Sequence, residues 1–217
     1  MLLGTTVYFN WESTDNHKYL FVYWSLALCC TFSLPKSQWG ESLARTSRLL
    51  IALCMVLATM WKVCTPEYID GRFFTFELLV DDRFAHFTSW TTGLSLKTLA
   101  DNHLLREQLV TGQLGGLTSV SLAGGQHVAL LAQFLTWWTV LIEGLIGLLF
   151  FLPKSNWSRH SRNVLLILFA VTTYSVAPVR GFGWMLMLLG LAQCETEDRY
   201  YRWGYLAALL LIQAYTI

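Results

Sequence analysis

A run of 26 residues from His127 to Leu152 contains a single charged side chain, Glu143. A helix needs about 20 apolar residues to cross the roughly 30 Å hydrocarbon core of a bilayer, so this run is long enough to span one. Lipid offers no hydrogen-bond partners, and a single segment satisfies its own backbone only as an α-helix. The run therefore predicts a membrane helix.

Five more apolar runs follow or precede this one. Pro35, Pro153 and Pro178 close three of the six runs, and proline ends helices because it lacks an N–H donor. Between the fourth and fifth runs, Pro178, Gly181 and Gly183 favour a tight reversal; a single broken helix there would leave five spans. The sequence predicts an all-α, multi-pass integral membrane bundle of about six spans. The five further runs are 19–34, 49–63, 164–177, 182–194 and 203–217.

The overall composition fits a lipid environment. Charged residues make up 13% of the chain, hydrophobic residues 54%, and the formal net charge is +1. Soluble domains usually carry about 25% charged residues. The small net charge leaves no basic surface for nucleic acid, and the ten tryptophans suit the two membrane–water interfaces. We expect the lipid bilayer and other membrane proteins as partners, and no nucleic acid.

The charges in the loops predict an orientation. Loops 35–48 and 153–162 each contain three Lys or Arg residues and fall on one side of a six-span chain, whereas the long loop 65–126 contains seven of the fourteen acidic residues. Positively charged loops stay in the cytoplasm. We therefore predict that 1–217 forms a single membrane domain whose loop 65–126 is extracytoplasmic.

The long loop is predicted to contain short helices of its own. Four apolar residues recur at helical spacing near its start: Phe73, Phe76, Val80 and Phe84. With charged residues on the opposite side, this pattern is typical of an amphipathic helix lying on the membrane surface. A second such helix is predicted around 90–99, and a third over 102–112 with Gly112 as its terminator.

Glu143 is the first candidate functional residue. An ionisable side chain inside a membrane helix is costly and normally faces protein. Gln133, Thr136, Thr139 and Gly147 lie on the same helical face and form a narrow polar and small-residue stripe. Glu143 would handle a proton or orient a ligand, with Thr139 as a binding residue; alternatively, a protonated or paired carboxyl would hold helices together. Both roles remain open.

Lys62 and Arg180 are the candidate cationic residues. Lys62 lies at the end of the second run, where a lysine usually extends its ammonium to the interface. A desolvated lysine there would instead serve as a general base. Arg180 lies in the reversal between two runs and would bind lipid phosphate or pair with an acid. The five cysteines contain no C-x-x-C pair and the histidines no zinc spacing, so we predict neither a metal site nor a haem site.

The segment that begins at Lys62 resembles a known family. A membrane helix that ends in Lys62, followed by Tyr68 and Gly71, is similar to the horizontally transferred transmembrane family, whose best-known members are the vitamin-K-dependent gamma-carboxylases. The resemblance covers roughly residues 50–190 and includes Trp137, Trp138, Glu143 and His160. It implies a helical membrane domain in which Lys62 is the base and Tyr68 belongs to the binding site.

Two functional hypotheses follow from these observations. The first is a non-catalytic accessory or structural subunit of a larger membrane assembly, because small-residue stripes such as Gly183 and Gly190 favour helix packing. The alternative is a small membrane-embedded enzyme in which Lys62 and Glu143 act on a lipid-soluble, quinone-like substrate. A transporter is disfavoured because the two halves lack matching broken helices.

Overall fold

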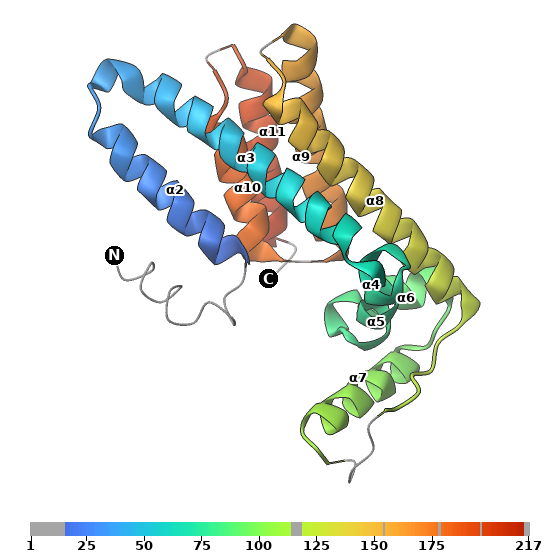
Figure 1. Cartoon of the computed structure of the whole chain (residues 1–217). Coiled ribbons are helices and arrows are strands. Elements are labelled where there is room, and N and C mark those ends of the chain that lie inside the picture. Colours follow the sequence, from blue (N-terminus) through green and yellow to red (C-terminus); the bar gives the residue numbers. More distant parts are fainter. Residues whose placement is uncertain (1–15, 114–118, 154, 178, 196, 215–217) are drawn as a thin grey trace. The chain divides into compact units, whose positions relative to one another are not determined.

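A computed structural model describes residues 16–113, 119–153, 155–177, 179–195 and 197–214 of the chain. Every regular element in these ranges is helical and none is a strand, which confirms the all-α class. Each predicted apolar run overlaps one helix (Figure 1). In chain order these are α2 (Asn16–Phe32), α3 (Trp39–Cys64), α8 (Gln126–Phe151), α9 (Asn156–Val176), α10 (Arg180–Ala192) and α11 (Arg199–Ala214).

Two of these helices, within the part of the chain that is described, are long and apolar enough to cross a membrane. They are α3, counted with the short 3-10 turn before it (36–64), and α8. The criterion is length and composition alone. Helix α10 is apolar but has 13 residues, fewer than the roughly 20 that a perpendicular span needs. The count of six spans therefore stays a prediction.

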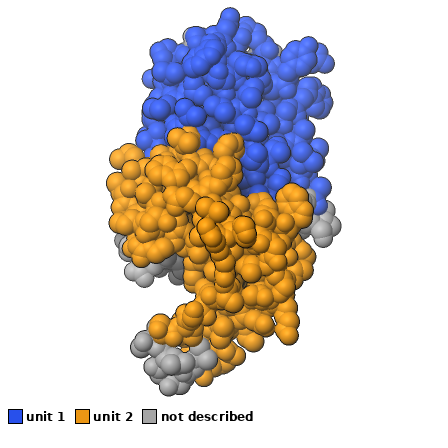
Figure 2. All heavy atoms as spheres, turned by 90° about the vertical axis from the view of Figure 1, so that its right-hand side faces the viewer, with its two compact units in different colours: residues 1–58, 142–217 blue, residues 59–141 orange. Residues whose placement is uncertain are grey.

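The chain divides into two compact units, which Figure 2 shows in different colours. Unit 1 comprises residues 1–58 and 142–217, and unit 2 comprises residues 59–141. Helices α3 and α8 each contribute residues to both units.

Unit 1 is built around α9, α10 and α11, which pack against one another, while α10 also packs against α2. Helices α9 and α10 run in opposite directions (Figure 1), so the reversal predicted near Pro178 is present. Pro153 follows the end of α8, and Ser155 then caps α9 reciprocally with Ser158. Gly147 permits a close approach between helices, because a Cβ atom there would lie 2.7 Å from Val56 Cγ2.

A buried polar cluster joins three helices of unit 1. Asn163 Oδ1 accepts hydrogen bonds from Gln193 Nε2 and from the Tyr205 hydroxyl, both at 2.6 Å. Asn163 and Tyr205 are at most 1% exposed. Buried polar groups need such partners, and the cluster fixes the packing of α9, α10 and α11.

Unit 2 contains the four short helices of the long loop, α4 (Pro66–Ile69), α5 (Arg72–Val80), α6 (Asp82–Thr92) and α7 (Leu96–Val110). Helices α5, α6 and α7 pack against one another. Gly93 adopts a left-handed conformation after α6, and Ser95 caps α7. The buried Asn102 side chain donates to Ala123 O at 2.8 Å and accepts from Ala123 N at 2.9 Å, which fastens the following segment to α7.

The prediction of a single amphipathic helix from Phe73 to Phe84 is wrong. The structure breaks it at Asp81, whose extended backbone and side-chain acceptor cap α6. Val80 and Phe84 are buried, whereas Phe73 and Phe76 are 38% and 43% exposed. The four residues therefore do not form one outward apolar face. The third predicted helix is present but begins earlier, at Leu96, and Gly112 follows it with a φ of 71°.

Candidate functional site

Tyr68 forms the centre of the candidate site in unit 2. It lies on α4, directly after α3 ends, and only 2% of it is exposed. Its ring stacks on Phe73 at a centroid distance of 5.1 Å and meets Phe74 and Trp61 edge-on at 5.5 Å and 6.1 Å. Its hydroxyl lies 2.8 Å from Thr139 Oγ1 on α8. The aromatic contacts hold the ring in place, and the hydroxyl is directed at Thr139.

The polar stripe of α8 contacts the backbone of α4. Thr136 Oγ1 donates to Tyr68 O at 3.3 Å, and Gln133 Nε2 donates to Ile69 O at 3.4 Å. Thr139 also donates its proton within its own helix, to carbonyl oxygens at 2.9–3.0 Å. Because a hydroxyl has one proton to give, Tyr68 is the donor in its bond with Thr139. The polar stripe predicted from the sequence therefore forms hydrogen bonds to the short helix α4.

Lys62 lies beside the same ring. Its Nζ atom is 5.4 Å from the centroid of Tyr68, within the roughly 6 Å range of cation–π attraction. The side chain is half-buried. The attraction acts on the ammonium and is lost by a neutral amine. This geometry suits a lysine that helps to position the aromatic turn.

Gly71 completes the turn. Its φ of 81° lies in the left-handed region, which favours glycine. A Cβ atom at this position would also lie 2.9 Å from Gln133 Oε1. Lys62, Tyr68 and Gly71, on which the family resemblance is based, therefore lie in one small region together with Thr139.

Glu143 and Arg180 belong to unit 1. Glu143 is 6% exposed, so its carboxyl faces protein. Arg180 begins α10, and its side chain lies outside the described residues. His160 is exposed, and its Nδ1 hydrogen-bonds the Tyr201 hydroxyl of α11. None of these residues belongs to unit 2, which contains Lys62.

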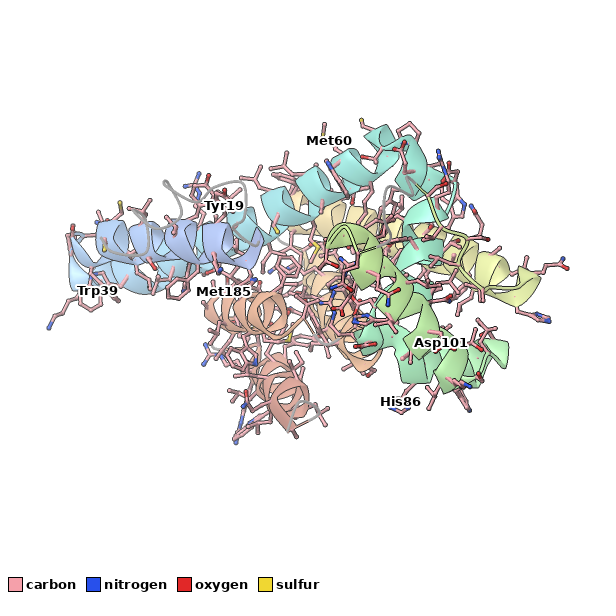
Figure 3. All side chains as sticks on the ribbon, turned by 90° about the horizontal axis from the view of Figure 1, so that it is seen from below. Tyr19, Trp39, Met60, His86, Asp101 and Met185 are labelled. Atoms are coloured by element: carbon pink, nitrogen blue, oxygen red, sulfur yellow. The ribbon has the colours of Figure 1, made fainter. Side chains whose placement is uncertain are left out.

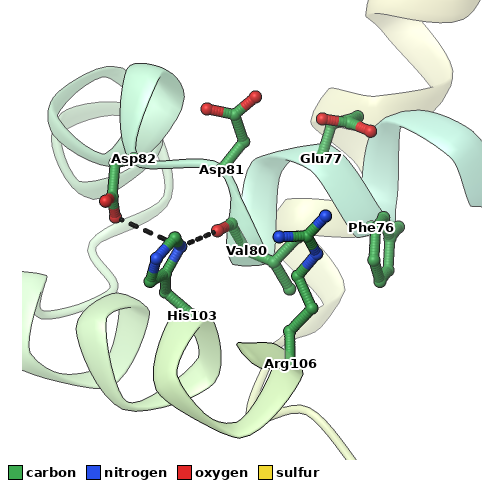
Figure 4. Close-up of a pocket in the computed structure, with 7 residues that line it drawn as sticks. All are labelled: Phe76, Glu77, Val80, Asp81, Asp82, His103 and Arg106. Atoms are coloured by element: carbon green, nitrogen blue, oxygen red, sulfur yellow. Dashed lines mark hydrogen bonds and ion pairs between the residues drawn. The ribbon is translucent and has the colours of Figure 1, made fainter. Parts of the chain in front are cut away.

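A pocket of about 250 Å³ lies between α5, α6 and α7 (Figure 4). His103 of α7 binds Val80 O at 2.7 Å through Nδ1, which is also 3.6 Å from Asp82 Oδ1. Its Nε2 lies 3.3 Å from Glu107 Oε1. The residues that line the pocket are Phe76, Glu77, Val80, Asp81, Asp82, His103 and Arg106.

The pocket favours a charged histidine. The hydrogen bond to Val80 O, followed by the charges of Asp82 and Glu107, raises the pKa of His103 above its ordinary value. Only an imidazolium donates from both ring nitrogens, to Val80 O and to Glu107. Burial, followed by the neighbouring Asp81, raises the pKa of Glu77. The sequence analysis missed this pocket, although His103 and Glu107 have the i, i+4 spacing of a helical pair.

The described residues include no group of three or more His, Cys, Asp or Glu side chains arranged to hold a metal ion. The five cysteines, which all lie within the described residues, form no disulfide. The Tyr68 cluster (Lys62, Tyr68, Gly71 and Thr139) and the His103 pocket are the two candidate sites in unit 2.

Comparison of the chain with protein families, with curated proteins and with solved structures finds no match.

Proposed function

We propose that the chain is a multi-pass integral membrane protein that acts as a non-catalytic accessory subunit of a larger membrane assembly. The observation that carries the membrane part is the outward apolar surface of α3. Only 22% of its most apolar stretch is buried, and Leu57 and Met60 are 61% and 57% exposed. Figure 3 shows Met60 projecting away from its helix. Water would penalise so much exposed apolar area, whereas lipid or an apolar partner would not.

The proposed topology has six spans with loop 65–126 outside the cytoplasm. Exposed Asp101 on α7 (Figure 3) and half-buried Arg159 on α9 report the two sides. In a chain whose five cysteines are replaced by alanine, Asp101→Cys should react with an impermeant maleimide from outside intact cells, and Arg159→Cys only after permeabilisation. Labelling of both from the same side would contradict six spans.

The subunit role is supported by the environment of Lys62. The Lys62 Nζ atom lies over the Tyr68 ring, and this cation–π contact links the end of α3 to the turn that follows it. The hydroxyl of Tyr68 is already engaged by Thr139. Both side chains therefore serve the packing of the turn, as expected of a structural residue.

The assembly itself is tested by purification from native membranes in a mild detergent. A subunit should run as a defined complex of constant stoichiometry, which blue native electrophoresis and mass spectrometry can measure. The chain should also stay in the membrane pellet after carbonate extraction. A monodisperse single chain in several mild detergents would refute the subunit role, and release by carbonate would refute membrane integration.

An enzyme of the carboxylase-like membrane family is the second candidate. It is favoured by one observation, the position of Lys62 beside Tyr68 and Gly71. In this hypothesis Lys62 would act as the base on a lipid-soluble, quinone-like substrate. Lys62→Arg would then abolish turnover, because arginine keeps its proton. Unchanged assembly and host-complex turnover in Lys62→Arg would favour the subunit.

A further inference from the structure

His103 of α7 contacts all three helices that surround the pocket of unit 2 (Figure 4). Its Nδ1 atom lies 2.7 Å from Val80 O, at the end of α5, and 3.6 Å from Asp82 Oδ1, at the start of α6. Its Nε2 atom lies 3.3 Å from Glu107 Oε1 on α7 itself. Carbonyl oxygens in the last turn of a helix have no partner within that helix, so the imidazole supplies a donor to α5. These contacts hold the corner between α5 and α6 against α7.

The arrangement is complete only when the imidazole is protonated. Oxygen atoms face both ring nitrogens, whereas a neutral imidazole has an N–H on one nitrogen and a lone pair on the other. With the N–H on Nδ1, the lone pair of Nε2 would face the carboxylate of Glu107. The His103 side chain is 27% exposed, so protons from the solvent reach it. The hydrogen bond to Val80 O, followed by the charges of Asp82 and Glu107, accordingly raises the pKa of His103.

The other charged groups at the pocket have different roles. Arg83 Nε donates to Asp81 Oδ2 at 2.9 Å, so these two residues form their own ion pair. Glu77 and Arg106 also line the pocket. Arginine keeps its charge at every relevant pH. Burial, followed by Asp81, raises the pKa of Glu77, which makes Glu77 the second group that could titrate here and the one that an experiment must separate from His103.

The residue next to His103 attaches α7 to another segment. Asn102 is 1% exposed, and its side chain donates to Ala123 O at 2.8 Å and accepts from Ala123 N at 2.9 Å. A side-chain amide does not titrate, so this attachment does not depend on pH. Ala123 lies shortly before α8, which begins at Gln126. If α7 separates from α5 and α6 at His103, the segment before α8 therefore moves with it.

We infer that His103 is a proton-operated switch that holds α7 against the corner between α5 and α6. In the protonated state, α7 closes one wall of the pocket of about 250 Å³. Loss of the proton removes the attraction to Asp82 and Glu107, and α7 separates from the corner together with the segment at Ala123. The closed state prevails at acid pH, and the open state gains population as the pH rises through the folded pKa of His103.

The switch itself does not depend on the accessory role. Under the proposed topology, in which loop 65–126 is extracytoplasmic, it would respond to the pH outside the cytoplasm. The side of the membrane is measured by the labelling of intact cells, whereas the switch is measured on the purified chain in detergent. Failure of one proposal is therefore distinguishable from failure of the other.

The test measures the distance between α6 and α7 in the full-length chain. Its five cysteines are replaced by alanine, and spin labels are attached at His86→Cys and Asp101→Cys for double electron–electron resonance. Both positions are exposed and lie on the two helices (Figure 3). The label on α6 also removes the other histidine of these two helices. Between about pH 5 and about pH 8, the range in which histidine titrates, the distance distribution should gain a longer component.

Substitutions of the surrounding acids identify the group that titrates. Glu107→Gln and Asp82→Asn each remove a negative charge that faces His103, so each should move the midpoint of the transition to lower pH. Glu67→Gln is the matched control, because the Glu67 side chain on α4 is 60% exposed and that of Glu107 is 56% exposed. It should leave the midpoint unchanged, as should Glu77→Gln. A midpoint that moves with Glu77→Gln alone would assign the transition to a carboxyl group and overturn the inference.

His103→Gln removes the titrating group and should give the same distance distribution at both pH values. Hydrogen exchange of the unlabelled chain covers the case in which a label disturbs the packing. After correction for the intrinsic pH dependence of exchange, the amides of α7 should exchange faster at the higher pH, and those of His103→Gln should not. Far-UV circular dichroism should stay constant, which distinguishes separation of α7 from unfolding. A distribution that does not change with pH, a change that persists in His103→Gln, or a loss of helix over this range would overturn the inference.

Discussion

The hydrogen bond between Tyr68 and Thr139 predicts an unequal response to two substitutions. Tyr68→Phe removes the donor but keeps the ring packing, and should lower the free energy of unfolding by about 0.5–1.5 kcal/mol, the net value of one such bond. Thr139→Val removes the Thr139 acceptor for the hydroxyl of Tyr68, a residue 2% exposed. That substitution should cost about 1–3 kcal/mol, because a buried donor that loses this bond regains no hydration.

The double variant gives the sharper test. Tyr68→Phe combined with Thr139→Val removes both polar groups and leaves apolar side chains of similar shape in their place. Such a replacement is nearly neutral, so Tyr68→Phe should restore stability to Thr139→Val. Thr139 loses its bonds to its own helix as well, but those carbonyl oxygens keep their backbone partners.

The measurement is unfolding of the detergent-solubilised chain by SDS, followed by far-UV circular dichroism. Thr91→Val is the control, because Thr91 is exposed on α6 and its hydroxyl donates within its own helix, to Phe87 O at 2.7 Å. It should change stability by less than about 0.5 kcal/mol, as surface substitutions do. If the double variant is as unstable as the sum of the two single ones, Tyr68 does not donate to Thr139.

Three further predictions concern unit 2. Lys62→Arg should fold and assemble normally, whereas Lys62→Met should lose about 0.5–1 kcal/mol of cation–π attraction, measured by the same SDS titration. The pKa of His103 is raised in the folded chain, so protonation of His103 contributes its full stabilisation at a pH below the unfolded pKa of about 6.5. This contribution should be lost as the pH rises through the folded pKa. His103→Gln should flatten the pH dependence of the stability of α7, measured by hydrogen exchange. Gly71→Ala should lower the free energy of unfolding by about 1–2 kcal/mol because of the left-handed backbone, and by a further amount because the new Cβ atom displaces Gln133. Gly93→Ala has open space around it and should show only the loss due to the backbone. Equal losses would exclude the Gln133 contact.

The helices could be predicted from the sequence because their causes are local. Apolar runs closed by proline gave the positions of α2, α8 and α9, and Gly112 marked the end of α7. The predicted helix through Asp81 failed because helical spacing of apolar residues did not reveal that Asp81 caps a new helix. A capping side chain ends one helix and starts another without altering the apolar pattern.

The side-chain partners could not be predicted, because they depend on residues far apart in the chain. Tyr68 meets Thr139 across 71 positions, and Asn102 meets Ala123 across 21. A polar residue in the sequence indicates that a partner is needed but not which one. Arg162 illustrates the limit: a loop arginine by sequence, it is almost wholly buried in the structure.

The polar stripe of α8 shows how one sequence feature can serve two purposes. Gln133, Thr136 and Thr139 all bond to α4 within unit 2, whereas Glu143, one turn further on, is buried in unit 1. A single row of polar residues on a helix suggests one shared function, but the row here is divided at residue 141 between two cores. The hydroxyl and amide groups of the stripe donate to backbone carbonyl oxygens of α4. An ionised carboxylate has no proton to donate and could not do so.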